Sequence, residues 1–114
     1  LNDYTALLHL TEGFSVLEVE VQDGDWLGGR NLATLALPKE GIIVLGIRRP
    51  DGTYIGTPTG NTGVDVGDTL TVYGRFAQLE ELNHRKHGTS GMYAHLTAVT
   101  EHKRDGNEKD EAVN

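Results

Sequence analysis

The sequence predicts an α+β domain, and three observations support that class. Apolar and polar residues alternate with the period of a strand in several short segments between residues 14 and 74. Turn-forming residues, among them Pro50 and Gly52, separate these segments. Beyond residue 75 the apolar residues recur at helical spacing instead. Strands interrupted by one short helix and followed by further helices are typical of the α+β class.

The chain length of 114 residues fits one compact domain. A domain of this size buries roughly two-thirds of the surface of its unfolded chain, so it can form a core without disulfides. The chain has no cysteine, which excludes thiolate metal sites. Its formal net charge of -7 argues against a general affinity for DNA, RNA or anionic lipid. No run of about 18 apolar residues is present, so no membrane-spanning helix is predicted.

Residues 1–13 are predicted to be a linker or a helical lead-in. Within them, residues 3–10 can form one or two helical turns with their apolar side chains on one side: Tyr4, Leu7 and Leu8. Residues 14–21 alternate strictly, which predicts a strand with one buried face. The buried face carries Leu17, Val19 and Val21, and the exposed face carries Glu18 and Glu20. After a turn at residues 23–25, Asn31 is suited to cap a short helix that stops before Pro38.

Residues 41–49 predict a second strand, and both of its faces are apolar over most of its length. One face would carry Ile43, Leu45 and Ile47, and the other would carry Ile42, Val44, Gly46 and Arg48. Both faces should therefore be covered. In a domain this small, a second copy of the chain can provide one of the covers.

The turn Pro50-Asp51-Gly52 predicts a short return strand at residues 53–57. A glycine-rich loop at residues 59–63 precedes another alternating strand at residues 69–74. Two amphipathic helices follow; the first would bury Phe76, Leu79 and Leu82, and the second Met92, Leu96 and Val99. We expect residues 84–102 to form a C-terminal helical extension and the charged residues 103–114 to be disordered.

The motifs of common enzymes are missing, so we predict no catalytic residues and no enzyme activity. The glycines fit neither the dinucleotide fingerprint nor the phosphate-binding loop. Neither of the two serines, Ser15 and Ser90, lies in a nucleophile motif. The histidines lack zinc-site spacing, so no metal site is predicted. An acidic cation site remains a weaker alternative to turn capping for Asp23, Asp25 and Asp68.

Arg48 has two interpretations. It can be the solvated end of a strand. Alternatively, it ends the face formed by Ile42, Val44 and Gly46, where apolar contact, close backbone approach and a guanidinium would suit a phosphate-bearing ligand.

Five segments taken together resemble the TrkA-C domain, the C-terminal half of the RCK (regulator of potassium conductance) module. They are LGGRNL at residues 27–32, LP at 37–38, GIIVLGIRR at 41–49, GDTL at 67–70 and YG at 73–74. The resemblance implies a small α+β domain at residues 14–83, with a mostly antiparallel sheet and short helices. The C-terminal helix predicted from the apolar spacing lies beyond the resemblance. Such domains dimerise on the cytosolic side of cation channels and transporters.

The resemblance also implies a function. We expect a cytoplasmic ligand-sensing regulatory domain of a potassium, cation or other solute transport protein. It would be a homodimer attached to a transmembrane transport unit in the same or a partner chain, with no cofactor and no nucleic-acid polymer as partner. Some members bind cyclic di-AMP between protomers, and by position that pocket falls on Ile42, Ile43, Arg48, Tyr54 and Ile55. The alternative is a structural dimerisation module with no small-molecule ligand.

Overall fold

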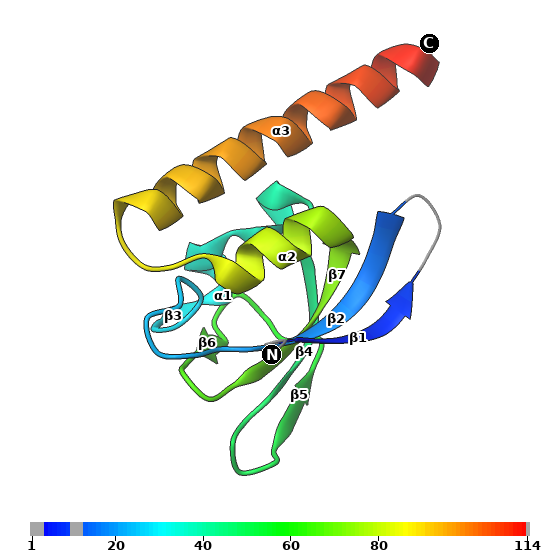
Figure 1. Ribbon diagram of the computed structural model, residues 1–114. Helices are drawn as coiled ribbons and strands as arrows, with labels where there is room; N and C mark the ends of the chain where they lie inside the picture. The colour runs from blue at the N-terminus through cyan, green and yellow to red at the C-terminus, as the bar shows by residue number, and fades with distance from the viewer. Residues whose placement is uncertain (1–3, 10–12, 114) are drawn as a thin grey trace.

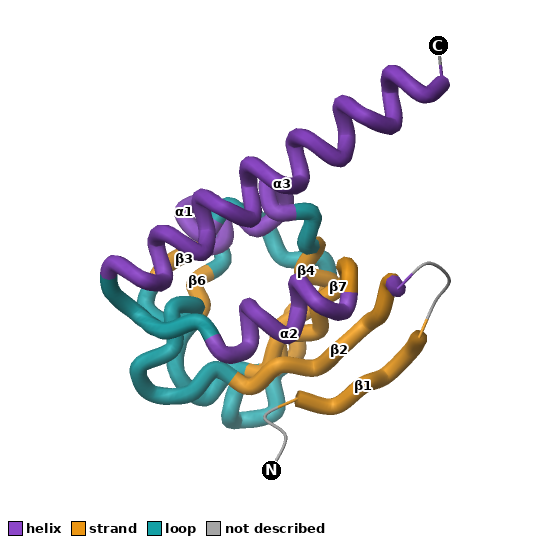
Figure 2. Tube along the Cα trace, turned by 45° about the horizontal axis from the view of Figure 1, so that its top comes forward, coloured by secondary structure: helices purple, strands orange, loops and turns teal. Residues whose placement is uncertain are grey.

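The computed structural model describes residues 4–9 and 13–113. Its main feature is a five-stranded antiparallel sheet in the order β1-β2-β7-β4-β5. The strands are β1 (Tyr4–His9), β2 (Phe14–Glu20), β7 (Thr69–Arg75), β4 (Ile43–Arg48) and β5 (Tyr54–Gly56). Two helices, α2 (Phe76–His84) and α3 (Thr89–Val113), lie on one side of this sheet, and α3 projects beyond it (Figures 1 and 2). The predicted α+β class is confirmed.

The central strands β2 and β7 follow the predicted alternation. Leu17 lies opposite Val72, and Val19 lies opposite Leu70. All four side chains are fully buried because this face of the sheet packs against the helices. The core contains these residues together with Val21, Trp26, Leu27, Leu35, Leu37, Ile42, Ile47, Val64, Leu79 and Leu82.

The N-terminal segment is a strand, so the helix predicted for residues 3–10 is wrong for Tyr4–His9; residues 3 and 10 lie outside the described residues. β1 pairs with β2 in antiparallel register. A short apolar run is compatible with either a helix or a strand. Residues 4–9 form a strand because the edge of β2 offers them backbone hydrogen bonds along its whole length.

Asn31 caps α1 (Leu32–Leu35), as predicted: its side-chain oxygen accepts a hydrogen bond from the Thr34 backbone N–H at 2.9 Å. The helix is shorter than expected, because Ala36 adopts the left-handed conformation with φ 52. A 3₁₀ helix, η2 (Leu37–Glu40), follows and contains Pro38. Next to α1, β3 (Arg30–Asn31) and β6 (Gly63–Val64) form a separate two-stranded pair.

The first predicted C-terminal helix is confirmed as α2, which buries Leu79 and Leu82. The second is confirmed as α3, but its predicted buried face is wrong for Met92 and Leu96, and Val99 is only half-buried. Met92 is 47 % exposed and Leu96 is 56 % exposed, whereas Gly91 and Ala98 are buried. α3 also continues as a helix to Val113, through residues predicted to be disordered. Among the described helices, none combines the length and apolar character that crossing a membrane requires.

A buried polar network holds α3 against the body of the domain. Arg85 donates from Nη1 and Nη2 to the two Glu40 carboxylate oxygens, at 2.9 and 2.7 Å. Arg85 also pairs with Glu81. From α3, His95 Nδ1 lies 2.5 Å from Glu40 Oε2, and its ring stacks on Trp26 with 5.2 Å between centroids. The network therefore joins η2, α2 and α3.

Arg85 stays charged in this network. Burial alone lowers the pKa of Arg85, but the hydrogen bonds and charges of Glu40 and Glu81 outweigh it, and the net pKa is raised. A raised pKa favours the protonated folded state. This stabilisation is therefore complete below the ordinary arginine pKa and is lost only at still higher pH.

Candidate functional site

A β-bulge in β4 determines which residues share the outer face of the sheet. Val44 lies opposite Val72, but Gly46 lies opposite Thr71, so Leu45 is an extra residue in the strand. An extra residue reverses the alternation of the side chains that follow it. Ile42 and Ile47, on either side of the bulge, are consequently both buried in the core.

The predicted faces of this strand are therefore wrong. Ile43 pairs with Tyr73 and Arg48 pairs with Thr69, and both partners point away from the core. Ile43 and Arg48 thus lie together on the outer face, although strict alternation had separated them. Ile42, which had been placed beside Arg48, packs on the opposite side of the sheet.

The return strand β5 adds Tyr54 to the outer face. Tyr54 pairs with Arg48, and its ring crosses over Gly46. A Cβ atom on Gly46 would lie only 1.9 Å from Tyr54 Oη, so this position of the ring requires glycine. Because Tyr54 remains 56 % exposed, it presents an aromatic surface next to the arginine.

The Arg48 guanidinium already has one acidic partner. Its Nη1 donates to Glu18 Oε2 at 3.1 Å, and 45 % of the Arg48 side chain is exposed. The other guanidinium N–H groups remain available, since a guanidinium has about five donors. The neighbouring Arg49 serves a structural role, because it binds Asp68 at 2.5 Å and the Gly63 carbonyl at 3.0 Å.

An apolar pocket of about 420 Å³ adjoins Ile43. It lies between β4, the α1–η2 segment and the loop at residues 58–60. Six of its lining residues are Leu32, Ala36, Pro38, Ile43, Val44 and Pro58. Ile43 therefore belongs both to this pocket and to the outer face that carries Arg48.

Of the five predicted site residues, the structure places three on the same outer face of the sheet: Ile43, Arg48 and Tyr54. Ile42 lies in the core behind them, and Ile55 pairs with the buried Ile47 and is half-buried. Sequence reasoning missed the contact of Glu18 with Arg48. The alternation of residues 14–21 placed Glu18 on an exposed face, but only the strand order shows that this face leads to Arg48.

Two of the three acidic residues considered for cation binding, Asp25 and Asp68, have partners from the chain itself. Asp25 accepts a hydrogen bond from Lys86 Nζ at 2.6 Å, and Asp68 binds Arg49. Over the residues that the structure describes, no group of three or more histidine, aspartate or glutamate side chains is arranged to hold a metal ion.

In a comparison with protein families, the model of the TrkA-C domain family matches residues 16–86. The matched segment begins in β2 and ends just after α2, so it contains Ile43, Arg48 and Tyr54, whereas β1 and α3 lie outside it. Among curated proteins, none matches the chain.

Proposed function

The chain belongs to the TrkA-C domain family of regulatory domains of transport proteins, and from that premise we propose that it is a dimeric sensor of a small effector. It would act on the cytoplasmic side of the membrane, with a potassium, cation or other solute transport unit in the same or a partner chain. The domain would bind and transmit, and would catalyse no reaction.

The grouping of Ile43, Arg48 and Tyr54 on one outer face is the observation that carries this proposal. Ile43 is 44 % exposed and Tyr54 is 56 % exposed, and Leu45 at the bulge adds a third large apolar side chain at 42 %. Exposed apolar side chains on the same sheet face as an arginine suit an interface that encloses an anionic ligand.

We propose cyclic di-AMP as the effector. The ligand has twofold symmetry, so on the twofold axis of a homodimer it would receive one Arg48 per phosphate. Tyr54 offers a ring on which an adenine can stack. Because the ligand would contact both protomers, it would favour the dimer geometry in which the two outer faces meet.

Calorimetric titration of the purified chain with cyclic di-AMP tests this proposal. We expect one ligand per dimer, and we expect Arg48→Ala to weaken binding by about 10- to 100-fold because a charged hydrogen bond is lost. Arg104→Ala, on the exposed side of α3, is the matched control and should bind like the original chain. The absence of heat at high micromolar ligand, or equal binding by Arg48→Ala, would remove cyclic di-AMP from this site.

The ion pair of Arg48 with Glu18 favours a second candidate function. An arginine that is already neutralised can serve a structural dimerisation module without any small ligand. That module would form a dimer in sedimentation experiments, and its melting temperature would not change with a panel of nucleotides.

A further inference from the structure

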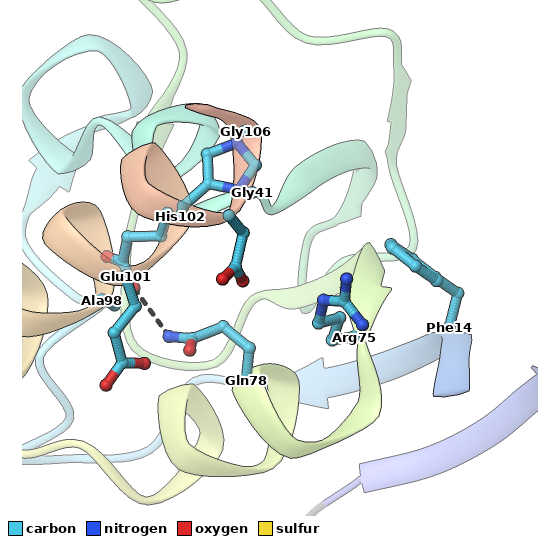
Figure 3. A pocket seen from close by; sticks show the side chains of 10 residues that line it. Phe14, Gly41, Arg75, Gln78, Ala98, Glu101, His102 and Gly106 are labelled. Atoms are coloured by element: carbon cyan, nitrogen blue, oxygen red, sulfur yellow. Dashed lines mark hydrogen bonds between the residues drawn. The ribbon is translucent and has the colours of Figure 1, made fainter. Parts of the chain in front are cut away.

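A second cavity lies between α3 and the body of the domain and shares no lining residue with the pocket beside Ile43. Its volume is about 160 Å³. Gln78 and Arg75 line it from the body, and Glu101 and His102 line it from α3 (Figure 3). At its edge, Gln78 donates to the buried Glu40 at 3.1 Å (dashed in Figure 3), so that carboxylate is already satisfied.

The two walls of this cavity carry exposed side chains of opposite charge that do not form an ion pair with each other. On the body, the Arg75 guanidinium lies 4.8 Å above the centre of the Phe14 ring. On α3, Glu101 and Asp105 are one helical turn apart and both line the cavity. Within the described side chains, none of these three charged groups takes part in an ion pair.

The arrangement of charge limits the class of ligand. A simple anion would be attracted by Arg75 but repelled by the two carboxylates, and a simple cation would meet the reverse. A molecule with an anionic and a cationic group a few bonds apart can interact favourably with the charges on both walls. The volume of about 160 Å³ suits a ligand of a few non-hydrogen atoms.

We propose that this cavity binds a small zwitterion of the α-amino acid type. Its carboxylate would accept hydrogen bonds from the Arg75 guanidinium, for which carboxylates are well-matched partners. Its ammonium group would lie toward Glu101 and Asp105. The His102 ring rests on the Gly41 backbone and forms a further wall; a Cβ on Gly41 would lie 2.7 Å from His102 Nδ1.

A ligand in this cavity would contact both the body and α3, so it would stabilise the docked position of the helix. The fluorescence of Trp26 can be used to follow the docking of α3. Trp26 is the only tryptophan and stacks on His95 of α3. Its fluorescence should therefore change when α3 becomes more firmly docked.

The test is a titration of the full chain with free glycine and free L-alanine, followed by Trp26 fluorescence and by melting temperature. We expect a saturable fluorescence change and a higher melting temperature. Acetate and methylammonium, which each carry one of the two charges, should produce neither effect at the same concentrations. Arg75→Gln should weaken binding by about tenfold or more, because it removes the carboxylate partner.

Arg48→Gln is the matched control for the arginine, since it lies on the outer sheet face; it should leave the amino-acid titration unchanged. Arg75→Gln should keep the circular dichroism spectrum and the cyclic di-AMP titration of the original chain, so this proposal and the effector proposal can fail separately. Three results would overturn the zwitterion site: no saturable response to either amino acid, an equal response to acetate, or unchanged binding by Arg75→Gln.

Discussion

At the scale of single residues, Gly46 shows how a missing side chain shapes the candidate effector site. The Tyr54 ring occupies the space where a Cβ on Gly46 would lie. The clashing atom is the far end of an exposed side chain that can move. Gly46→Ala should therefore cost little stability, but it should displace Tyr54 from its position beside Arg48.

We expect Gly46→Ala to weaken effector binding about as much as Tyr54→Ala, because both changes remove the same aromatic surface. The measurement is calorimetry on the two single variants and on the double variant. If the double variant binds as weakly as either single variant, the two residues act as a unit. Additive losses would show that Gly46 acts in some other way.

Asn83 is a buried residue whose side-chain amide has no hydrogen-bond partner among the residues that the structure describes. It is 3 % exposed, and neither its amide nitrogen nor its carbonyl oxygen has a hydrogen-bond partner. A buried unpaired polar group lowers stability by about 1–3 kcal/mol. Asn83→Leu, which keeps the branching of the side chain, should thus raise the free energy of unfolding by about 1 kcal/mol in urea denaturation. Asn61→Leu in an exposed loop is the control, and a less stable Asn83→Leu would indicate a buried water on the amide.

At the scale of elements, α3 docks through small residues rather than through its large apolar ones. A Cβ on Gly91 would lie 2.1 Å from the Lys86 carbonyl oxygen and 2.7 Å from Trp26 Cδ1. Gly91→Ala should therefore push the start of α3 away from the body and cost at least about 1 kcal/mol. Thermal unfolding and Trp26 fluorescence measure this effect.

Gly106→Ala in the same helix is the matched control, since nothing lies within 4 Å of a Cβ at that position. Alanine is the better helix former, so this variant should be more stable by up to about 1 kcal/mol. The two glycine substitutions are thus predicted to change the free energy of unfolding in opposite directions. A stabilising Gly91→Ala would mean that α3 does not pack against Trp26.

The elements that the sequence predicted well are those whose pattern comes from one buried face. β2, β7 and α2 each bury residues at regular spacing, so their periods are visible without the fold. The bulge at Leu45 is different, because a register shift depends on the partner strand. The docked face of α3 was missed for a related reason: close approach at Gly91 and the contact of His95 with Glu40 outweigh the apolar spacing of Met92 and Leu96.

The candidate site was also predictable only in part from the sequence. Arg48 and Tyr54 were identified as candidates from the resemblance, with Arg48 also singled out by the chemistry of its strand, and they lie together on one surface. Grouping Ile42 with Arg48 failed because the alternation reverses between them. The Glu18 ion pair and the apolar pocket at Pro58 depend on segments that only the folded sheet and its loops bring together.

At the scale of the whole molecule, the outer face of β4 and β5 should be the surface that holds two copies together. Ile43, Leu45 and Tyr54 are all large, apolar and more than 40 % exposed. In a dimer these side chains would be removed from water, and each fully buried side chain of this kind contributes about 1.5–3 kcal/mol. A carboxylate placed among them would have to leave water when the dimer forms, which costs free energy.

Ile43→Glu should consequently raise the dimer dissociation constant at least about tenfold. Sedimentation velocity at several protein concentrations measures this change. Met92→Glu is the control because Met92 is similarly exposed, at 47 %, but lies on α3. Circular dichroism should confirm that both variants are folded. If Met92→Glu dissociates the dimer and Ile43→Glu does not, then the copies associate through α3, and the Arg48 sites of two protomers do not face each other.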